Sequence, residues 1–327
     1  MRVLITGGAG YIGSHTAKAL AAAGFDVFVV DNLSTGHRWA VRWGPLLEGD
    51  LADRAFLSNI FGKHRFEAVI HFAALALVAE SFQKPSAYFH NNVTNTLNLL
   101  DCMVEHGVPI IVFSSSCSTY GIPDALPVTE DQPQRPICPY GESKLAAERA
   151  LYWYGKIYSR RWAALRYFNA AGADPDGELG EVHDPETHLI PIAIQTALGF
   201  RDHLDVLGHD HITTDGTAVR DYIHVCDLAK AHLDSLEYLL AGGESSAFNL
   251  GSGRGQSVQE IIHAVERLTG RPVRVRKCGR RPGDPPELVA DATRAAAFLR
   301  WRPQYSLDAI IQTALKWEQA RNLAAQL

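Results

Sequence analysis

A chain of 327 residues, 46% hydrophobic and 20% charged, is long enough to bury a large core as one large domain or two closely joined ones. Its 31 basic and 36 acidic side chains give a net charge of −5 without long runs of either sign, which excludes a broad surface for nucleic acid. No segment is apolar enough to span a bilayer and no export signal is evident, so we expect a cytoplasmic protein without membrane partners.

Five scattered cysteines without C-x-x-C spacing favour reduced thiols over disulfides or structural zinc.

Short β-branched runs alternate with helical patterns up to about residue 168. The expected strands are 3–6, 27–30, 68–72, 110–114 and 163–167. This alternation predicts an α/β fold with a Rossmann-like, doubly wound parallel sheet and helices on both faces.

The second half of the chain is rich in glycine, proline and aspartate, with shorter helices expected at 191–199, 227–240 and 258–268. We therefore predict a nucleotide-binding domain at 1–168, to which a segment near 218–241 returns, and a smaller C-terminal α/β domain at 169–327. A cleft between the two domains is the expected ligand site.

The segment ITGGAGYIG places Gly7, Gly10 and Gly13 between the first expected strand and a helix. Glycines allow a tight turn there, and the helix N-terminus offers unpaired N–H groups to a pyrophosphate. Asp31 ends the next strand, at the offset expected for an acid that binds the adenosine ribose. Its charge would repel a 2′-phosphate, so the pattern predicts NAD rather than NADP, with Arg38 the one nearby cation that argues the other way.

The segment CPYGESKLAAE places Tyr140 one helical turn before Lys144, on the same helix face. A free tyrosine has a pKa of about 10, and a cation nearby can lower it by roughly 1 to 3 units. With the positive charge of NAD⁺ added, we expect Tyr140 to act as a base toward a sugar hydroxyl. The strand IIVFSSS ends at Ser114 to Ser116, where a hydroxyl can share that proton. The spacing alone also arises by chance in helices, and only its combination with the glycine turn favours catalysis.

Further motifs extend this pattern over most of the chain, in order: MRVLITGGAGYIGSHT, VIHFAA, HNNVTNTLNLL, FSSSCSTYG, PYGESK, LRYFNAAGA, DGTAVRDYIHVCDLA and RRPGD. Together they closely resemble the UDP-glucose 4-epimerase family of the extended short-chain dehydrogenase/reductase superfamily. The resemblance implies an isomerase of galactose metabolism with bound NAD, which interconverts UDP-glucose and UDP-galactose through a 4-keto sugar. It also implies a homodimer, with a seam formed by the helices expected at 85–106 and 139–158, although the apolar stripe of these helices could equally face only the sheet.

The resemblance implies the role of each matching residue. Tyr140 is the base, Lys144 its partner on the nicotinamide ribose, and Ser116 assists at the sugar O4. The implied cofactor-binding residues, besides Tyr140 and Lys144, are Gly7, Gly10, Tyr11, Ile12, Gly13, Asp31, Asn32, Asp50, Leu51, Phe72, Ala73, Ala74, Asn91, Ser114 and Tyr167. The implied substrate-binding residues are Ser116, Asn169, His188, Leu189, Leu204, Val206, Leu207, Arg220, Arg281, Asp284 and Leu288.

Two positions depart from the family pattern. Ala76 stands where many members carry a lysine that contacts the cofactor, which predicts looser retention of NAD. Leu288 stands where narrow-pocket members carry a tyrosine, which predicts room for an N-acetyl group and activity on UDP-GlcNAc.

Related activities were weighed against the residues that follow Ser116. Cys117 and Ser118 occupy the place where 4,6-dehydratases need an acidic pair, and the glutamate of UDP-glucuronate decarboxylases is absent. A uronate or pentose 4-epimerase stays open, because it would use the same catalytic residues. An NAD-sensing protein without catalysis is disfavoured by the intact Tyr140 and Lys144.

Two histidine-containing loops were weighed as metal sites: His209, Asp210 and His211 in one, and His183, Asp184, Glu186 and His188 in the other. Neither has the helical i, i+4 histidine spacing of common metal motifs, so we predict no metal. Cys117 beside the serines has no convincing base nearby, which favours a packed thiol over a nucleophile.

Overall fold

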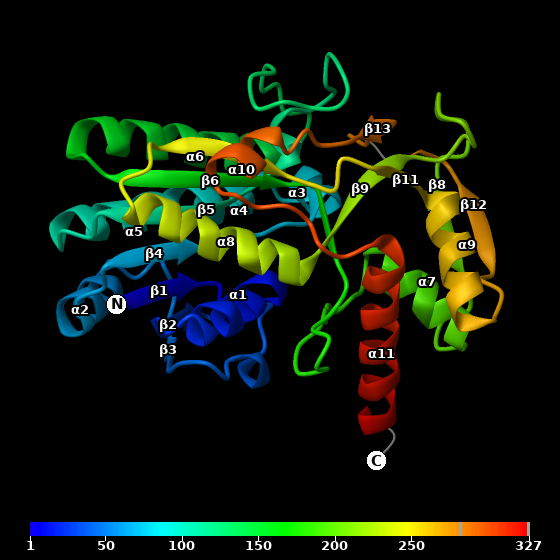
Figure 1. Cartoon of the computed structure of the whole chain (residues 1–327), viewed down its shortest axis with the longest axis horizontal. Helices are drawn as coiled ribbons and strands as arrows, with labels where there is room; N and C mark the ends of the chain where they lie inside the picture. The colour runs from blue at the N-terminus through cyan, green and yellow to red at the C-terminus, as the bar shows by residue number, and fades with distance from the viewer. Residues whose placement is uncertain (281–282, 326–327) are drawn as a thin grey trace.

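Seven parallel strands form the main sheet, in the order β3-β2-β1-β4-β5-β6-β10 (Figure 1). The computed structural model describes residues 1–280 and 283–325. The strands are β1 Arg2–Thr6, β2 Asp26–Asp31, β3 Leu46–Glu48, β4 Ala68–His71, β5 Ile110–Ser116, β6 Arg161–Tyr167 and β10 Ser246–Leu250. The strand order reverses between β1 and β4, and such a switch point opens a crevice at the carboxyl edge of a sheet.

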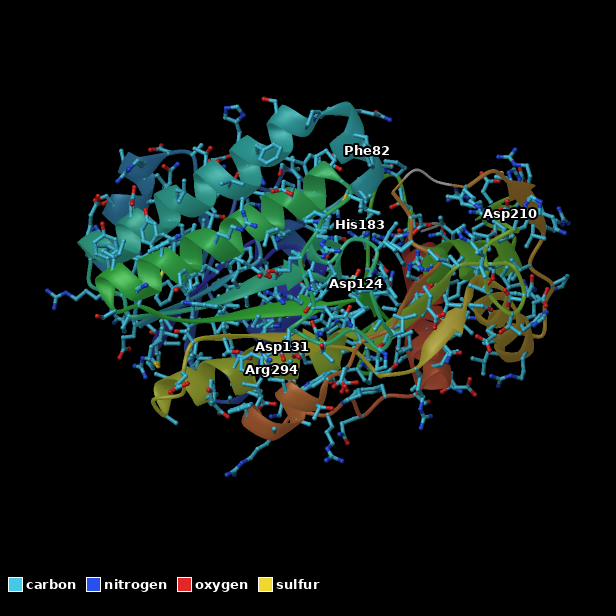
Figure 2. The ribbon with its side chains drawn as sticks, turned by 90° about the horizontal axis from the view of Figure 1, so that it is seen from above. Phe82, Asp124, Asp131, His183, Asp210 and Arg294 are labelled. Atoms are coloured by element: carbon cyan, nitrogen blue, oxygen red, sulfur yellow. The ribbon has the colours of Figure 1, made fainter. Side chains whose placement is uncertain are left out.

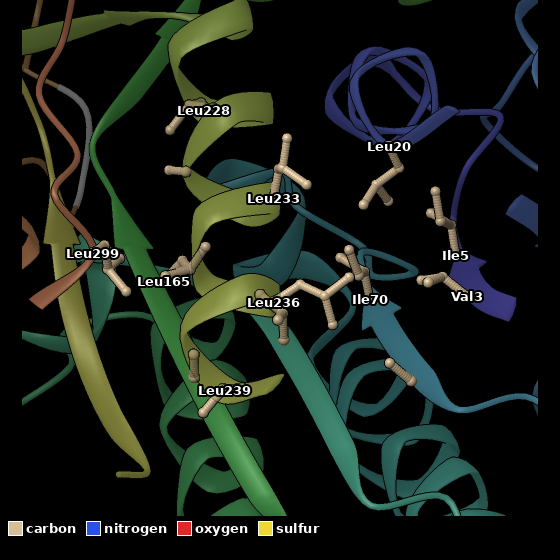
Figure 3. Packing of buried hydrophobic residues seen from close by; sticks show 14 of the residues in the cluster. Val3, Ile5, Leu20, Ile70, Leu165, Leu228, Leu233, Leu236, Leu239 and Leu299 are labelled. Atoms are coloured by element: carbon tan, nitrogen blue, oxygen red, sulfur yellow. The ribbon is translucent and has the colours of Figure 1, made fainter. Parts of the chain in front are cut away.

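Helices cover both faces of this sheet because its central strands are buried on both sides. On one face α1 (Tyr11–Ala22) and α8 (Val225–Leu240) lie side by side, and leucines of α8 pack on β1, β4 and β6 (Figure 3). On the other face α2 (Arg54–His64), α5 (Asn95–Glu105) and α6 (Pro139–Tyr158) bury a second apolar cluster. The sheet and its two helical layers hold the carboxyl edge rigid.

A smaller unit lies beyond this edge and has its own apolar cluster (Figure 1). One short sheet joins β7 (Asn169–Ala171), β9 (Val219–His224), β11 (Gly255–Ser257) and β13 (Glu287–Leu288); another pairs β8 (Leu204–Leu207) with β12 (Val275–Cys278). The helices of this unit are α7 Leu189–Leu198, α9 Val258–Thr269 and α11 Leu307–Ala325. α10, Thr293–Phe298, packs on β10 of the main sheet.

The expected elements are present, with differences at their ends. The helix predicted at 85–106 is divided into α4 (Pro85–Phe89), a π-helical turn (His90–Thr94) and α5. The segment expected to return near 218–241 contains α8, but β10 follows it, and β9 at its start pairs in the smaller sheet. The short α3 (Val78–Gln83) was not expected. None of the described helices combines the length and apolar character needed to cross a membrane.

Candidate active site

The turn between β1 and α1 brings backbone close to backbone. Gly7 has a φ of +72°, and a Cβ atom there would lie 2.5 Å from the Ala73 nitrogen, after β4. A Cβ on Gly13 would lie 2.3 Å from the Gly7 oxygen. Gly10 caps α1 without a side-chain hydrogen bond, so the N–H groups of its first turn are left for a ligand. This cradle fits the pyrophosphate of a dinucleotide.

Asp31 and its neighbours form the adenosine side of the candidate site. Asp31 is buried at the end of β2, where its carboxylate accepts the N–H groups of Ala9 at 3.0 Å and Leu33 at 2.8 Å. Burial raises the pKa of Asp31, and these two hydrogen bonds oppose that rise. Asn32 donates to Asp50 at 2.8 Å, which joins the two residues expected near the ribose and the adenine.

Arg38, the cation that argued for NADP, forms an exposed ion pair with Glu48 of β3. A guanidinium already paired with a carboxylate is a poorer partner for a 2′-phosphate. The position of Arg38 therefore favours NAD.

The remaining cofactor candidates surround the same edge. Tyr11 and Ile12 lie in the first turn of α1, and the turn after β4 carries Phe72 to Ala74. Asn91 lies in the π-helical turn, and the exposed Ala76 follows the β4 turn. Leu51 needs a correction, because its side chain packs into the core and leaves only its backbone for a ligand.

The serines of β5 face partners from two directions. Ser114 shares a hydrogen bond with the Tyr167 hydroxyl at the end of β6, and its carbonyl accepts the Lys144 ammonium at 2.8 Å. Ser116 ends the strand, and its hydroxyl accepts the Ser118 N–H at 3.1 Å. The edge thus gathers Ser114, Ser116, Lys144 and Tyr167, with Tyr140 beside Ser116.

Tyr140 and Lys144 lie in the first two turns of α6 and are both buried. The Lys144 nitrogen also lies 4.9 Å from the centre of the Phe113 ring. Burial lowers the pKa of Lys144 to about 7, although the Glu148 carboxylate opposes this effect. The amine is therefore held ready to gain or lose a proton near neutrality.

Without NAD⁺, the surroundings of Tyr140 do not make its phenol acidic. Burial, with a smaller contribution from the Tyr167 phenol, raises the pKa of Tyr140, and the Ser116 hydroxyl only partly opposes it. Desolvation outweighs the cation one turn away, because Lys144 is itself buried and directed at the Ser114 carbonyl. A phenolate therefore needs a further positive charge at the site.

Two sets of contacts hold α6, the helix that carries Tyr140 and Lys144, in place, and the sequence analysis identified neither. Asn92 donates to the Leu75 carbonyl at 2.9 Å and to the Ser143 hydroxyl at 3.0 Å, which ties α6 to the loop after β4. Glu148 pairs with Arg166 of β6 at 2.6 Å and accepts a hydrogen bond from Ser115. A glutamate one turn after Lys144, on the same face, was the available signal for the second support.

The residues expected to hold the UDP moiety lie in the smaller unit. Arg220 of β9 is buried, pairs with Asp284 and donates to the Pro285 carbonyl at 2.6 Å. Asn169 begins β7, which pairs with β9. Arg281, expected to act with them, lies outside the described residues.

The residues expected around the uracil and the sugar are only partly placed as predicted. Leu204 and Val206 need a correction, because strand alternation turns both side chains into the core of the smaller unit. Leu207 points to the other side. Leu288 lies opposite Arg220 on β13 and packs in a buried cluster with Cys117 and Phe168, next to Ser116.

The loop before α7 gathers two histidines and two glutamates. His188 is the first residue before α7, Leu189 begins the helix, and the His188 ring nitrogen Nδ1 lies 2.9 Å from Glu186. His183 joins this group, as does Glu181, which the sequence did not single out. The other loop is exposed at His209 and Asp210, while His211 is buried.

Cys117 fits the packed thiol expected for it. It is buried in the Leu288 cluster, and burial raises the pKa of Cys117 to about 12. A thiol of that pKa is fully protonated at neutrality and is a poor nucleophile.

The parallel sheet, the glycine cradle and the buried tyrosine and lysine define a Rossmann-fold NAD-dependent enzyme of the short-chain dehydrogenase/reductase class. The chain belongs to the NAD dependent epimerase/dehydratase family, whose model matches residues 3–251.

Full-length relatives support this assignment. The chain is 50% identical over 320 residues to a UDP-glucose 4-epimerase of Rhizobium meliloti, with 98% of each chain covered. A UDP-glucose 4-epimerase from Brucella ovis, solved in complex with NAD, is 53% identical, with a TM-score of 0.94 over 96% of this chain and 97% of that one. A UDP-Glc/GlcNAc 4-epimerase from Campylobacter jejuni is 41% identical, with a TM-score of 0.85 over 98% and 99%.

Lys144→Met should increase stability while it removes activity. Below about pH 7 Lys144 is charged both in the buried site and in the unfolded chain. Folding then removes the full ammonium charge from water, and this desolvation lowers the free energy of unfolding by its largest amount. As the pH rises toward about 10.4, the folded chain holds a neutral amine and the cost disappears. We expect the variant to gain on the order of a few kcal/mol in free energy of unfolding at pH 7, and less at pH 10.

Urea unfolding at several pH values measures this gain. Lys156→Met, at an exposed position of the same helix, is the control and should change little. A variant less stable than the parent at pH 7 would contradict the desolvation argument.

Proposed function

We propose that this chain is a UDP-sugar 4-epimerase, which interconverts UDP-glucose and UDP-galactose by way of a 4-keto sugar. The observation that carries the proposal is the set of buried groups at the carboxyl edge of β5: Tyr140 beside Ser116, and Lys144 on the Ser114 carbonyl. The relatives named above support the choice of sugar nucleotide.

Tyr140 is the proton acceptor for the 4-hydroxyl of the sugar, and Ser116 hydrogen-bonds the same oxygen. When bound in the glycine cradle, NAD supplies the hydride acceptor and a positive charge beside the phenol. Lys144, with a pKa near 7, stabilises the phenolate of Tyr140 and holds the nicotinamide ribose. Burial of these groups excludes water, which protects the keto sugar while it remains in the site.

The two halves of the substrate are held differently. Hydride leaves C4 on one face and returns on the other, so the keto sugar must turn over while the nucleotide stays in place. By motif position, Arg220, Arg281, Asn169 and Asp284 hold the UDP moiety, and the two arginines among them face its diphosphate. Arginine suits this task, because its planar donors match anionic oxygens.

This division suggests the roles of the two units. The NAD-binding domain comprises 1–168, completed by α8 and β10, and the rest of 169–327 binds the UDP-sugar. All five cysteines are free, as in the reducing cytoplasm where we place the protein.

The direct test incubates the purified chain with UDP-galactose, UDP-GlcNAc or UDP-glucuronate, without added reductant, and identifies the products. Tyr140→Phe should lower epimerisation of UDP-galactose by about 10²- to 10⁴-fold, because it removes the proton acceptor. Tyr152→Phe, at an exposed position of α6, is the control and should keep full activity.

Undiminished activity of Tyr140→Phe would contradict the assignment of the base. Inversion of UDP-glucuronate alone would instead favour the uronate epimerase. Absence of any sugar turnover together with tight NAD binding would favour the NAD-sensing protein.

We further propose that the chain accepts N-acetylated sugars, because Leu288 is smaller than tyrosine and packs beside Cys117 near the sugar position. The similarity to the Campylobacter jejuni UDP-Glc/GlcNAc enzyme supports this. Leu288→Tyr should reduce turnover of UDP-GlcNAc at least about tenfold and leave UDP-galactose turnover within about threefold. The larger tyrosine side chain fills space that only the N-acetylated sugar needs. Undetectable UDP-GlcNAc turnover by the parent chain would reject the idea.

The homodimer is proposed from the outer face of α6. Trp153 is 52% exposed and Ile157 is 64% exposed, and Tyr152 and Tyr158 lie beside them. Such a patch is typical of a protein interface. Ile157→Glu should shift the mass measured by light scattering from two chains to one, whereas Ile212→Glu, on a distant exposed loop, should not. A parent chain that is monomeric at micromolar concentration would contradict the seam.

A further inference from the structure

The loop from Glu181 to His188 holds a compact group of four potential metal ligands. One ligand atom from each of Glu181, His183, Glu186 and His188 lies within 4.8 Å of the others. The side chains of both glutamates are only 6% exposed. Figure 2 labels His183 between the larger and the smaller unit, away from Asp210 at the far end of the smaller one.

Two buried atoms of this group have no hydrogen-bond partner among the described residues. They are Nδ1 of His183 and Oε2 of Glu186, and they face each other at 3.6 Å. The His183 nitrogen also lies 3.3 Å from Glu181 Oε1. Leaving buried polar atoms without a hydrogen bond costs about 1–3 kcal/mol each, and an ion bound between these two atoms would remove that cost.

The distances match those between ligands of one ion. A tetrahedral Zn²⁺ with bonds of about 2.0–2.2 Å separates its ligand atoms by about 3.4 Å. The two His183 distances bracket that value. His188 Nδ1 is closer, at 2.8 Å from Glu181 and 2.9 Å from Glu186, and would need to move outward by roughly 0.5 Å.

A second acidic cluster in the chain supplies the contrast. Asp174, Asp176 and Glu178 also gather within ligand distance, but the Lys18 ammonium lies between them at 2.8 to 2.9 Å. The chain provides its own cation there. Within the described residues, the carboxylates of Glu181 and Glu186 form ion pairs with the two histidines only, and Arg201 reaches the backbone oxygen of Glu186 but not its carboxylate.

We propose that Glu181, His183, Glu186 and His188 bind one divalent transition-metal ion, with Zn²⁺ the best match to two imidazole and two carboxylate ligands. The site joins the two units of the protein. The backbone of this loop contacts His37 through Val182 and Trp317 of α11 through Glu181. His183 also lines a small cavity together with Gly10 and Tyr11 of the cofactor turn. An ion here would fix the loop that leads into α7.

Metal binding should depend on pH. A histidine binds a metal ion only in its neutral form, so the ion competes with protons for His183 and His188. Tyr11 of α1 and Glu318 of α11 also face the cluster. The ion must displace protons from the histidines, so affinity should increase with pH.

The test titrates the EDTA-treated full-length chain with Zn²⁺ by calorimetry and measures bound metal by mass spectrometry. We expect one Zn²⁺ per chain, proton release on binding, and a visible d–d spectrum when Co²⁺ replaces Zn²⁺. Glu186→Gln and His183→Gln should each weaken binding by about 100-fold or more, a loss at the upper end of that seen for metal-site mutations. Asp176→Asn and His209→Gln are the controls and should bind as the parent does.

Failure of the parent to bind one equivalent would overturn the proposal. Retained affinity in both ligand variants, or loss of binding in His209→Gln, would do the same. Thermal melting in EDTA shows whether a variant is folded, and if Glu186→Gln is not, His183→Gln decides. If the chain bound no metal and its NMR spectrum showed both histidines protonated, the cluster would be two histidine–glutamate ion pairs instead. None of these measurements depends on sugar turnover, so the proposal stands or falls separately from the epimerase activity.

Discussion

The buried ion pair between Glu148 and Arg166 fixes the catalytic helix on the sheet. Both side chains are 7% exposed, and Arg166 also donates to the Tyr120 hydroxyl at 2.9 Å, which in turn donates to Asn249 of β10. Loss of one partner would leave an uncompensated buried charge, at a cost of about 3–5 kcal/mol. Because Lys144 lies one turn before Glu148 on α6, this pair also sets the rotation of the helix and the direction of the Lys144 side chain. The active site therefore depends on a contact that touches no ligand.

The parallel sheet then brings together groups from distant parts of the sequence. β1 ends at the glycine turn, β4 at His71 just before Phe72, β5 at its serines and β6 at Tyr167, all at the same edge. A parallel sheet makes this inevitable, since the carboxyl ends of all its strands point one way. The smaller unit faces this edge with Arg220 and Leu288 on neighbouring strands. The function proposed above accordingly places nucleotide binding and chemistry at the sugar on different elements.

The sequence predicted the fold well, because alternation of strands and helices is a local signal. The glycine turn, Asp31 and the pairing of Tyr140 with Lys144 are also local patterns, and the structure places them at one edge. The sequence did not indicate how strongly burial opposes an acidic phenol, because the desolvation of Tyr140 depends on everything packed around it, which no short motif encodes. The sequence did not show that the side chains of Leu204 and Val206 are buried, because a motif position does not say which face of a strand is buried. The supports Asn92 and Glu148 act across 51 and 18 residues of sequence, so only the folded chain shows their partners.

Lys18 has a wider consequence than neutralising three acids. It lies on α1, whose first turn forms the cofactor cradle, and it contacts Asp174 and Asp176 in the segment that follows β7 of the smaller unit. A displacement of α1 on filling the cradle would be transmitted through this contact to the strand that begins with Asn169. Lys18 is thus a direct contact between the helix of the cofactor cradle and the smaller unit. If dinucleotide binding changed the affinity for the nucleotide sugar through it, nucleotide-sugar binding would change the affinity for the dinucleotide by the same factor.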